Sequence, residues 1–316
     1  MIGQSQRLVQ SARSLALHHA LLLHGPSPKT LRAIAIVIAK ALNCRNKSEG
    51  DLCASCQKID RGIHPDVTIL EPAKDRKAIS IEQVRELVAN ASMRPYEGGV
   101  KVYLIDPADT LSGAAANALL KTLEEPPAGT FLLLVADQPG RLPATILSRC
   151  RKLAVPVPAT ADAESWLAEQ GVAHPALALA QAAGAPLSAL SFAGAAYAED
   201  RRSWLSALAN PQRLSVLARS AWIDAGGKEE RRTRLAQAIE WSLGWTVDLA
   251  RTASGADARR NPDFAPALAA LGLRVAPVAL FRYHRTLLGH RARLAHPLQP
   301  RWVAEALLMD YKILFS

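Results

Sequence analysis

The segment Gly25-Pro26-Ser27-Pro28-Lys29-Thr30 places a lysine and a hydroxyl residue directly after a short apolar run, as phosphate-binding loops do. In such loops the backbone N–H groups and the start of the next helix face the phosphates of a nucleotide. The pattern G-x-x-x-x-G-K-[ST] is broken here, because only three residues separate Gly25 from Lys29 and Pro28 replaces the second glycine. Proline removes an N–H donor and fixes φ. We therefore expect a relic loop, with Lys29 and Thr30 as relic contacts and no bound nucleotide.

Asp106, at the end of another apolar run, is the second candidate group. In nucleoside triphosphatases of this layout the strand-end aspartate holds Mg²⁺, and the glutamate after it polarises the attacking water. Pro107 occupies that glutamate position, and Asp109 is expected to cap the helix that begins near Thr110 or Leu111. Two independent defects thus argue against ATP hydrolysis by this chain. An active ATPase motor with a variant loop is the alternative.

Three cysteines follow the first helical stretch with the spacing Cys44-x8-Cys53-x2-Cys56. A CxxC pair with a third cysteine nearby is typical of a zinc site, but a closed tetrahedral site needs four ligands. His64 is a candidate for the fourth, although a turn or core histidine is the commoner case. The cysteines therefore predict either a zinc site with a missing ligand or a set of free thiols.

The elements that position these groups form an α/β pattern. Asp106 and Asp137 each follow a short β-rich run, and an Ala/Leu-rich helical stretch separates the two runs. Strand, helix and strand in this order predict a parallel sheet whose ligands bind at the carboxyl ends of the strands. The predicted strands are 20–24, 67–70, 100–105 and 130–136; the predicted helices are 1–20, 31–42, a helix opened by a capping box at Ser80, and the stretch between the last two strands.

The rest of the chain is predicted to be helical. The segment 155–158 (VPVP) is a linker, and we assign residues 1–157 to the α/β domain, 158–198 to a small helical lid and 199–316 to an all-α domain. Predicted helices of the last part are 203–208, 213–222, 229–251, 275–294 and 300–315, with Trp204, Trp222, Trp241, Trp245 and Trp302 mostly at core spacing. Residues 254–266 are predicted to be a loop.

Composition sets further bounds. The chain of 316 residues carries a formal charge of +10 and has no apolar run of the roughly 18 residues that a membrane span needs. The N-terminus lacks the apolar core of a signal peptide, so a cytoplasmic protein without a membrane partner is expected. Several arginines invite a DNA-binding interpretation, but a solvated helix face is the expectation for most of them: Arg231, Arg232, Arg234, Arg259, Arg260, Arg291 and Arg293.

Three motifs carry a resemblance to a known family. The run NALLKTLEEPP at 117–127, the ending ILSRC at 146–150 and the triplet HPD at 64–66 resemble the clamp loader subunits of bacterial DNA polymerase III, which belong to the AAA+ class. The resemblance implies an AAA+ module of RecA-like type, a helical lid and a C-terminal helical collar. Two members share these motifs: a motor subunit (gamma/tau) with intact Walker motifs, and a subunit that has lost them. The relic loop and Pro107 match the second.

The resemblance implies a role for Ser148-Arg149-Cys150, which matches the family's Ser-Arg-Cys motif. In the family this arginine reaches into the ATP site of the neighbouring motor subunit, so Arg149, with Ser148 beside it, is the implied catalytic group in trans. A guanidinium supplied in this way neutralises charge on the γ-phosphate, and such fingers are worth about 10³ to 10⁵ in rate in other systems. The alternative is an arginine that pairs with a carboxylate at a strand end.

The resemblance also implies partners and cofactors. The partners would be gamma/tau and delta subunits in a hetero-oligomeric ring, with the sliding clamp contacted indirectly and primer-template DNA through the assembled complex; ATP would be bound by the partner subunits. The family's zinc module has four cysteines, whereas this chain has three, with Gly50 or Ile59 at the vacant position. Leu187 stands where motor subunits carry a nucleotide-sensing arginine, which is a third lost contact.

Overall fold

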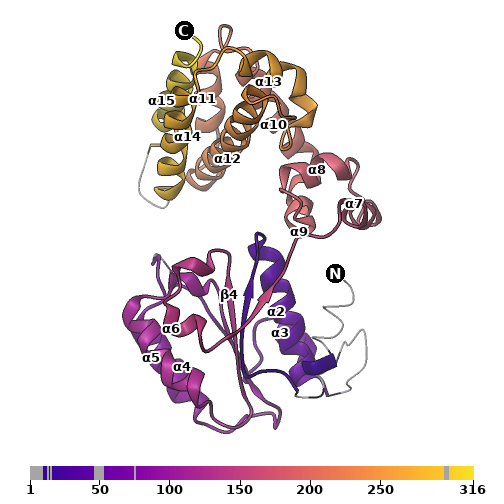
Figure 1. Ribbon diagram of the computed structural model, residues 1–316, viewed down its shortest axis with the longest axis vertical. Helices are drawn as coiled ribbons and strands as arrows, with labels where there is room; N and C mark the ends of the chain where they lie inside the picture. Colours follow the sequence, from indigo (N-terminus) through magenta and orange to yellow (C-terminus); the bar gives the residue numbers. More distant parts are fainter. Residues whose placement is uncertain (1–9, 13, 15, 46–52, 75, 295–298) are drawn as a thin grey trace. The chain divides into compact units, whose positions relative to one another are not determined.

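The computed structural model describes residues 10–12, 14, 16–45, 53–74, 76–294 and 299–316, in two compact units, 1–158 and 159–316 (Figure 1). Most of the predicted helix over residues 1–20 lies outside the described residues. The described end of that segment is not helical, because Ala20 already belongs to the first strand.

The first unit is built on one five-stranded sheet, counted over the part of the chain that the structure describes. All four strand pairs are parallel, in the order β2-β3-β4-β1-β5. The parallel sheet predicted from the sequence is therefore confirmed, with β3 beginning at Lys101 instead of Val100 and with β5 as an unpredicted edge strand. The strands are β1 (Ala20–His24), β2 (Val67–Leu70), β3 (Lys101–Ile105), β4 (Thr130–Ala136) and β5 (Arg151–Ala154).

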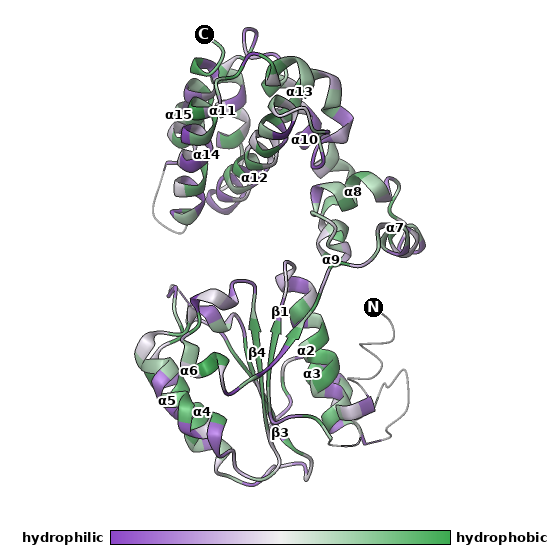
Figure 2. Ribbon diagram, viewed as in Figure 1, coloured by the Kyte–Doolittle hydropathy of each residue, from purple (hydrophilic) through white to green (hydrophobic). Residues whose placement is uncertain are grey.

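Helices cover both faces of this sheet because both faces of its strands are apolar. Leu21 and Leu23 of β1 pack with α2 (Pro28–Asn43) and α3 (Ala54–Asp60), whereas Leu22 faces the opposite layer. That layer contains α4 (Ile81–Ala91), α5 (Gly113–Glu124) and α6 (Ala144–Leu147) (Figure 1). Figure 2 shows the central strands in the hydrophobic colour between helices that carry purple on their outer sides.

Side-chain caps fix where the helices of this unit begin. The Ser80 capping box at the start of α4 is confirmed. The predicted cap at Asp109 is wrong, because the chain first makes the short 3₁₀ turn η1 (Ala108–Thr110). Ser112 then caps α5, its hydroxyl accepting the N–H of Ala115 at 3.1 Å, so the helix begins at Gly113. A further 3₁₀ turn, η2 (Pro139–Arg141), precedes α6.

The second unit is helical throughout its described residues. A small cluster formed by α7, α8 and α9 has its own core, separate from the larger core of the bundle that follows. The division of this unit into a lid and a collar near residue 198 remains a prediction. The elements are α7 (Thr160–Glu169), α8 (Pro175–Gln181), α9 (Pro186–Ala189), η3 (Leu190–Phe192), α10 (Ala195–Leu208), α11 (Val216–Asp224), α12 (Lys228–Ala253), η4 (Pro262–Phe264), α13 (Ala265–Gly272), α14 (Pro277–Ala292) and α15 (Pro300–Ile313).

Tryptophans fill much of the bundle core. Trp245 is fully buried, and its indole N–H donates to the Tyr311 hydroxyl at 2.8 Å. The core prediction is wrong for Trp302, whose residue surface is 70% exposed. The reason is its position on α15, which turns Val303, Leu307 and Tyr311 inward and leaves Trp302 on the outer face.

Several of the candidate DNA-contacting arginines make ion pairs on the surface. Arg231 lies 3.2 Å from Asp224, and Arg291 lies 3.5 Å from Glu240. These pairs favour the interpretation of a solvated helix face.

No single helix among the described residues is long and apolar enough to cross a membrane; only the segments Pro175–Gln181 and Pro186–Phe192 together, bent by 104°, reach that length and composition.

Candidate functional site

The relic loop uses its own polar groups internally. Ser27 is the N-cap of α2, where its hydroxyl oxygen accepts the N–H of Thr30 at 3.4 Å and lies 2.8 Å from the Thr30 hydroxyl. Pro28 begins the helix and has no N–H to offer. Two of the N–H donors that a phosphate would need are thus absent or already bound.

Gly25 has a packing role that the sequence did not reveal. A Cβ atom at this position would lie 2.2 Å from the carbonyl oxygen of Val155, at the exit of β5. The Val155 N–H in turn donates to the carbonyl of His24 at 2.8 Å. The glycine therefore permits the close approach of the linker to β1, whether or not an anion is bound.

Arg32 brings a cation to the candidate magnesium aspartate. Its Nη1 donates to Asp106 Oδ2 at 2.8 Å, and the same nitrogen contacts Glu71, which follows β2. The Asp106 side chain is only 9% exposed, whereas that of Arg32 is 40% exposed. Burial raises the pKa of Asp106 above its ordinary value, and the hydrogen bond and positive charge of Arg32 offset this only in part. The guanidinium therefore binds the carboxylate oxygen with which a strand-end aspartate would coordinate a metal ion.

Sequence reasoning missed both Arg32 and Glu71. The available signal was the pair of carboxylates at the ends of neighbouring parallel strands, since Leu70 of β2 pairs with Ile105 of β3. Two carboxylates at adjacent strand ends repel each other and require a cation between them. Arg32 lies two residues beyond Thr30 on the helix that leaves the same edge.

Asp109 and Asp137 lie close together on this edge. Burial and then the charge of Asp137 raise the pKa of Asp109. They do not form a three-ligand metal site with Asp106. Among the described residues, only the three cysteines place three potential ligand atoms close enough together to hold one ion.

Arg149 lies between α6 and β5 and is one-third exposed. Its Nε donates to Glu124 Oε1 at 2.6 Å, and its Nη2 forms an ion pair with the same carboxylate. Its Nη1 donates to the carbonyl of Thr145 at 2.9 Å and to the Ser148 hydroxyl oxygen at 3.3 Å. The structure therefore brings Ser148 and Arg149 together and adds Glu124, which sequence reasoning did not name.

The sulfur atoms of Cys44, Cys53 and Cys56 lie within 4.8 Å of one another, at the junction of α2 and α3. Three thiolates in this arrangement fit zinc or another soft cation. Ile59, one helical turn after Cys56, is buried and offers no ligand, and Gly50 lies outside the described residues. Burial and the neighbouring sulfur atoms raise the pKa of Cys56 to about 12, so a metal must displace a proton to bind there.

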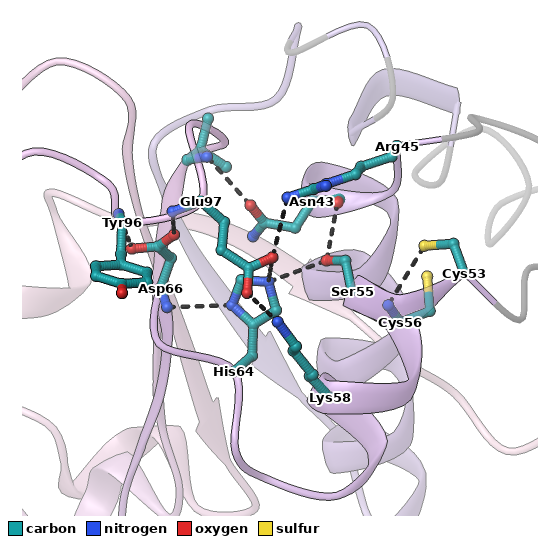
Figure 3. Close-up of polar contacts among 11 residues, drawn as sticks. Asn43, Arg45, Cys53, Ser55, Cys56, Lys58, His64, Asp66, Tyr96 and Glu97 are labelled. Carbon is teal, nitrogen blue, oxygen red and sulfur yellow. Dashed lines mark hydrogen bonds and ion pairs between the residues drawn. The ribbon is translucent and has the colours of Figure 1, made fainter.

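His64 belongs to a separate hydrogen-bond network and is not a cysteine partner (Figure 3). The Asp66 N–H donates to His64 Nδ1 at 3.1 Å, so the proton lies on Nε2, which is 2.9 Å from the Ser55 hydroxyl. Ser55 donates onward to the carbonyl of Asn43 at 3.0 Å. Burial lowers the pKa of His64 despite the nearby charge of Glu97. Both ring nitrogens are in use, which makes His64 a structural residue.

The same network ties two loops together. The carboxylate of Asp66 accepts the backbone N–H groups of Tyr96 and Glu97 at 2.7 and 2.8 Å. Glu97 in turn pairs with Lys58 of α3 (Figure 3). The triplet at 64–66 therefore fixes the loop before β3 against α3, which contains Cys56 and is capped by Cys53.

Comparison with known proteins identifies relatives. The family described as DNA polymerase III, delta subunit, matches residues 3–158. The chain is 35% identical over 240 residues to the DNA polymerase III subunit delta' of Pseudomonas aeruginosa, which covers 74% of this chain and 72% of that protein. It is 39% identical over 156 residues to the subunit tau of Escherichia coli, covering 48% of this chain and 24% of tau.

A solved structure has the same fold. A gamma subunit-related protein of DNA polymerase III from Thermotoga maritima superimposes with a TM-score of 0.51 at 16% identity, covering 98% of this chain and 99% of that one.

Proposed function

The chain belongs to the family of DNA polymerase III delta' subunits, and from this we propose that it is the non-catalytic subunit of a clamp loader, supporting ATP-driven loading of a sliding clamp onto primed DNA. In this proposal it binds gamma/tau and delta subunits in a hetero-oligomeric ring in the cytoplasm, and ATP is bound by those partners. It supplies Arg149 to the ATP site of the neighbouring motor subunit.

One observation carries the non-catalytic part of the proposal: Arg32 donates to Asp106 at 2.8 Å. A magnesium ion would have to displace a guanidinium from a buried carboxylate, and a partly buried charge pair resists that exchange more than an exposed pair does. Pro107 follows in the position of the water-polarising glutamate, so this edge also lacks a general base. Both features together argue against the alternative of an active ATPase motor.

The arginine-finger part rests on the family motif and on the position of Arg149. The side chain is on the surface, on the short turn between α6 and β5, where a neighbouring chain can reach it. A guanidinium offers paired N–H donors that match phosphate oxygens. Ser148 contacts Nη1 of this group and helps to orient it.

Two measurements test the proposal. Calorimetric titration of the purified chain with ATP and Mg²⁺, at concentrations that detect millimolar affinity, should show no binding; micromolar binding would restore the motor interpretation. In an assembly reconstituted with its partner subunits, Arg149→Ala should assemble normally and lose ATP turnover at one motor site. Arg151→Ala, an exposed arginine two residues away, is the matched control and should leave turnover unchanged. Unchanged turnover in Arg149→Ala would refute the finger.

A further inference from the structure

The carboxylate of Glu124 binds the same N–H donors of Arg149 that a phosphate group would bind. Its oxygen Oε1 contacts both Nε and Nη2, which form one edge of the guanidinium. This edge is one of those that bind carboxylate and phosphate oxygens in the two-point manner. The other terminal nitrogen, Nη1, is bound to Thr145 and Ser148. Each of the three guanidinium nitrogens is thus engaged within this chain.

We propose that Glu124 is a gate on Arg149: it holds the guanidinium in the free subunit and gives it up when the γ-phosphate of a neighbouring ATP competes for the same donors. This inference rests on the proposed function of Arg149. Glu124 is a positioning residue here, because it acts on the neighbouring site only through the arginine.

The position of Glu124 makes it a weak and exchangeable partner. It is the last residue of α5, where the carbonyl end of the helix disfavours a negative charge. Its side chain is 48% exposed, so water solvates the carboxylate readily once the arginine leaves. A phosphate with two or more charged oxygens competes well against such a partner.

Displacement of Glu124 from Arg149 also avoids a repulsion between its carboxylate and the γ-phosphate. A carboxylate and a γ-phosphate cannot share one edge of the guanidinium, because their charges repel at that distance. Neutralising Glu124 should therefore free the arginine and increase its engagement across the interface. An exposed ion pair of this kind shifts an equilibrium by about two- to five-fold. We expect this gain in kcat, because the guanidinium meets charge that develops in the transition state.

The first test uses the isolated chain. Phenylglyoxal labels accessible arginines, and peptide mapping by mass spectrometry gives the rate at Arg149. Glu124→Gln should raise that rate by about two- to five-fold. Glu125→Gln removes the same charge from the neighbouring residue, which is also exposed, and should leave the rate unchanged. Equal rates in all three proteins would overturn the contact.

The second test uses the reconstituted assembly. Glu124→Gln should raise ATP turnover by about two- to five-fold, and it should have no effect in an Arg149→Ala background. If Arg149→Ala lowers turnover but Glu124→Gln does not raise it, the gate is wrong and the finger stands. If turnover does not respond to Arg149→Ala, the finger is overturned and the gate with it.

Discussion

Replacing Arg32 by methionine should destabilise the first unit in a way that depends on pH. Methionine keeps an unbranched apolar side chain and removes the charge and the N–H donors of the guanidinium. The carboxylate of Asp106 then loses its hydrogen bond of 2.8 Å, while Glu71, a like charge, stays beside it. A hydrogen bond to a charged group contributes about 1.5–3 kcal/mol. Because Arg32 is 40% exposed, water replaces part of it, and we expect a loss of about 1–2 kcal/mol near pH 8.

The deficit should shrink as the pH falls. Burial already raises the pKa of Asp106 in the native protein, and loss of Arg32 should raise this pKa further. A protonated Asp106 needs no cation, so the penalty is present above its folded-state pKa and disappears as the pH falls through it.

The chain provides an internal control for this measurement. All six tryptophans lie beyond residue 158, so tryptophan fluorescence follows only the second unit. Hydrogen exchange of the β3 amides reports on the stability of the first unit. The expected loss of unfolding free energy corresponds to a fall in the melting temperature of that unit of about 2–8 °C. In an Asp106→Asn background Arg32→Met should cost much less. A deficit that is absent at pH 8, that does not vary with pH, or that persists in that background would refute the reasoning.

Three other substitutions give further expected outcomes. Gly25→Ala should destabilise the first unit by about 1–3 kcal/mol in urea unfolding, since its Cβ would lie 2.2 Å from the Val155 carbonyl oxygen, and equal stability would contradict the packing role. Ser80→Ala should cost about 1 kcal/mol by loss of the α4 cap, measured in the same way. Zinc affinity, measured by competition with a chelating dye, should fall at least ten-fold in Cys53→Ser and also as the pH is lowered, because the thiols must lose protons; an affinity that neither change alters would argue against a metal at this cluster.

The strands and their chemistry could be predicted from the sequence because local patterns determine them. Runs 20–24 and 130–136 are apolar, short and bounded by turns, and both strands were found where the pattern placed them. The edge strand β5 was not predicted. The missing loop glycine and Pro107 were visible as residue types alone. The start of α5 was predicted less well, because Asp109 and Ser112 are both good caps and the choice depended on the bridge between Ile79 and Leu111.

The partners of the two key arginines could not be predicted. Arg32 reaches a carboxylate 74 residues away, and Arg149 reaches one 25 residues earlier. Such pairs depend on which strands are neighbours and on where a helix ends, and no local periodicity records either. The prediction that Trp302 is buried was wrong for a related reason. Its spacing is compatible with a core position, and only the packing of α15 shows which face of the helix is outside.

The two arginine–carboxylate pairs have the same chemistry, and their burial gives them opposite consequences. Asp106 is buried at the sheet edge, so removing its arginine leaves a carboxylate that water solvates poorly. For the same reason, the pair disfavours metal binding at this carboxylate. Glu124 is half exposed at a helix end, so its arginine can leave at little cost. If this contrast is correct, Arg32→Met and Glu124→Gln should differ in kind. The first should lower the stability of the chain without affecting ATP turnover by the assembly, and the second should raise turnover without affecting stability. A stability loss in Glu124→Gln as large as that in Arg32→Met would show that burial does not separate the two pairs.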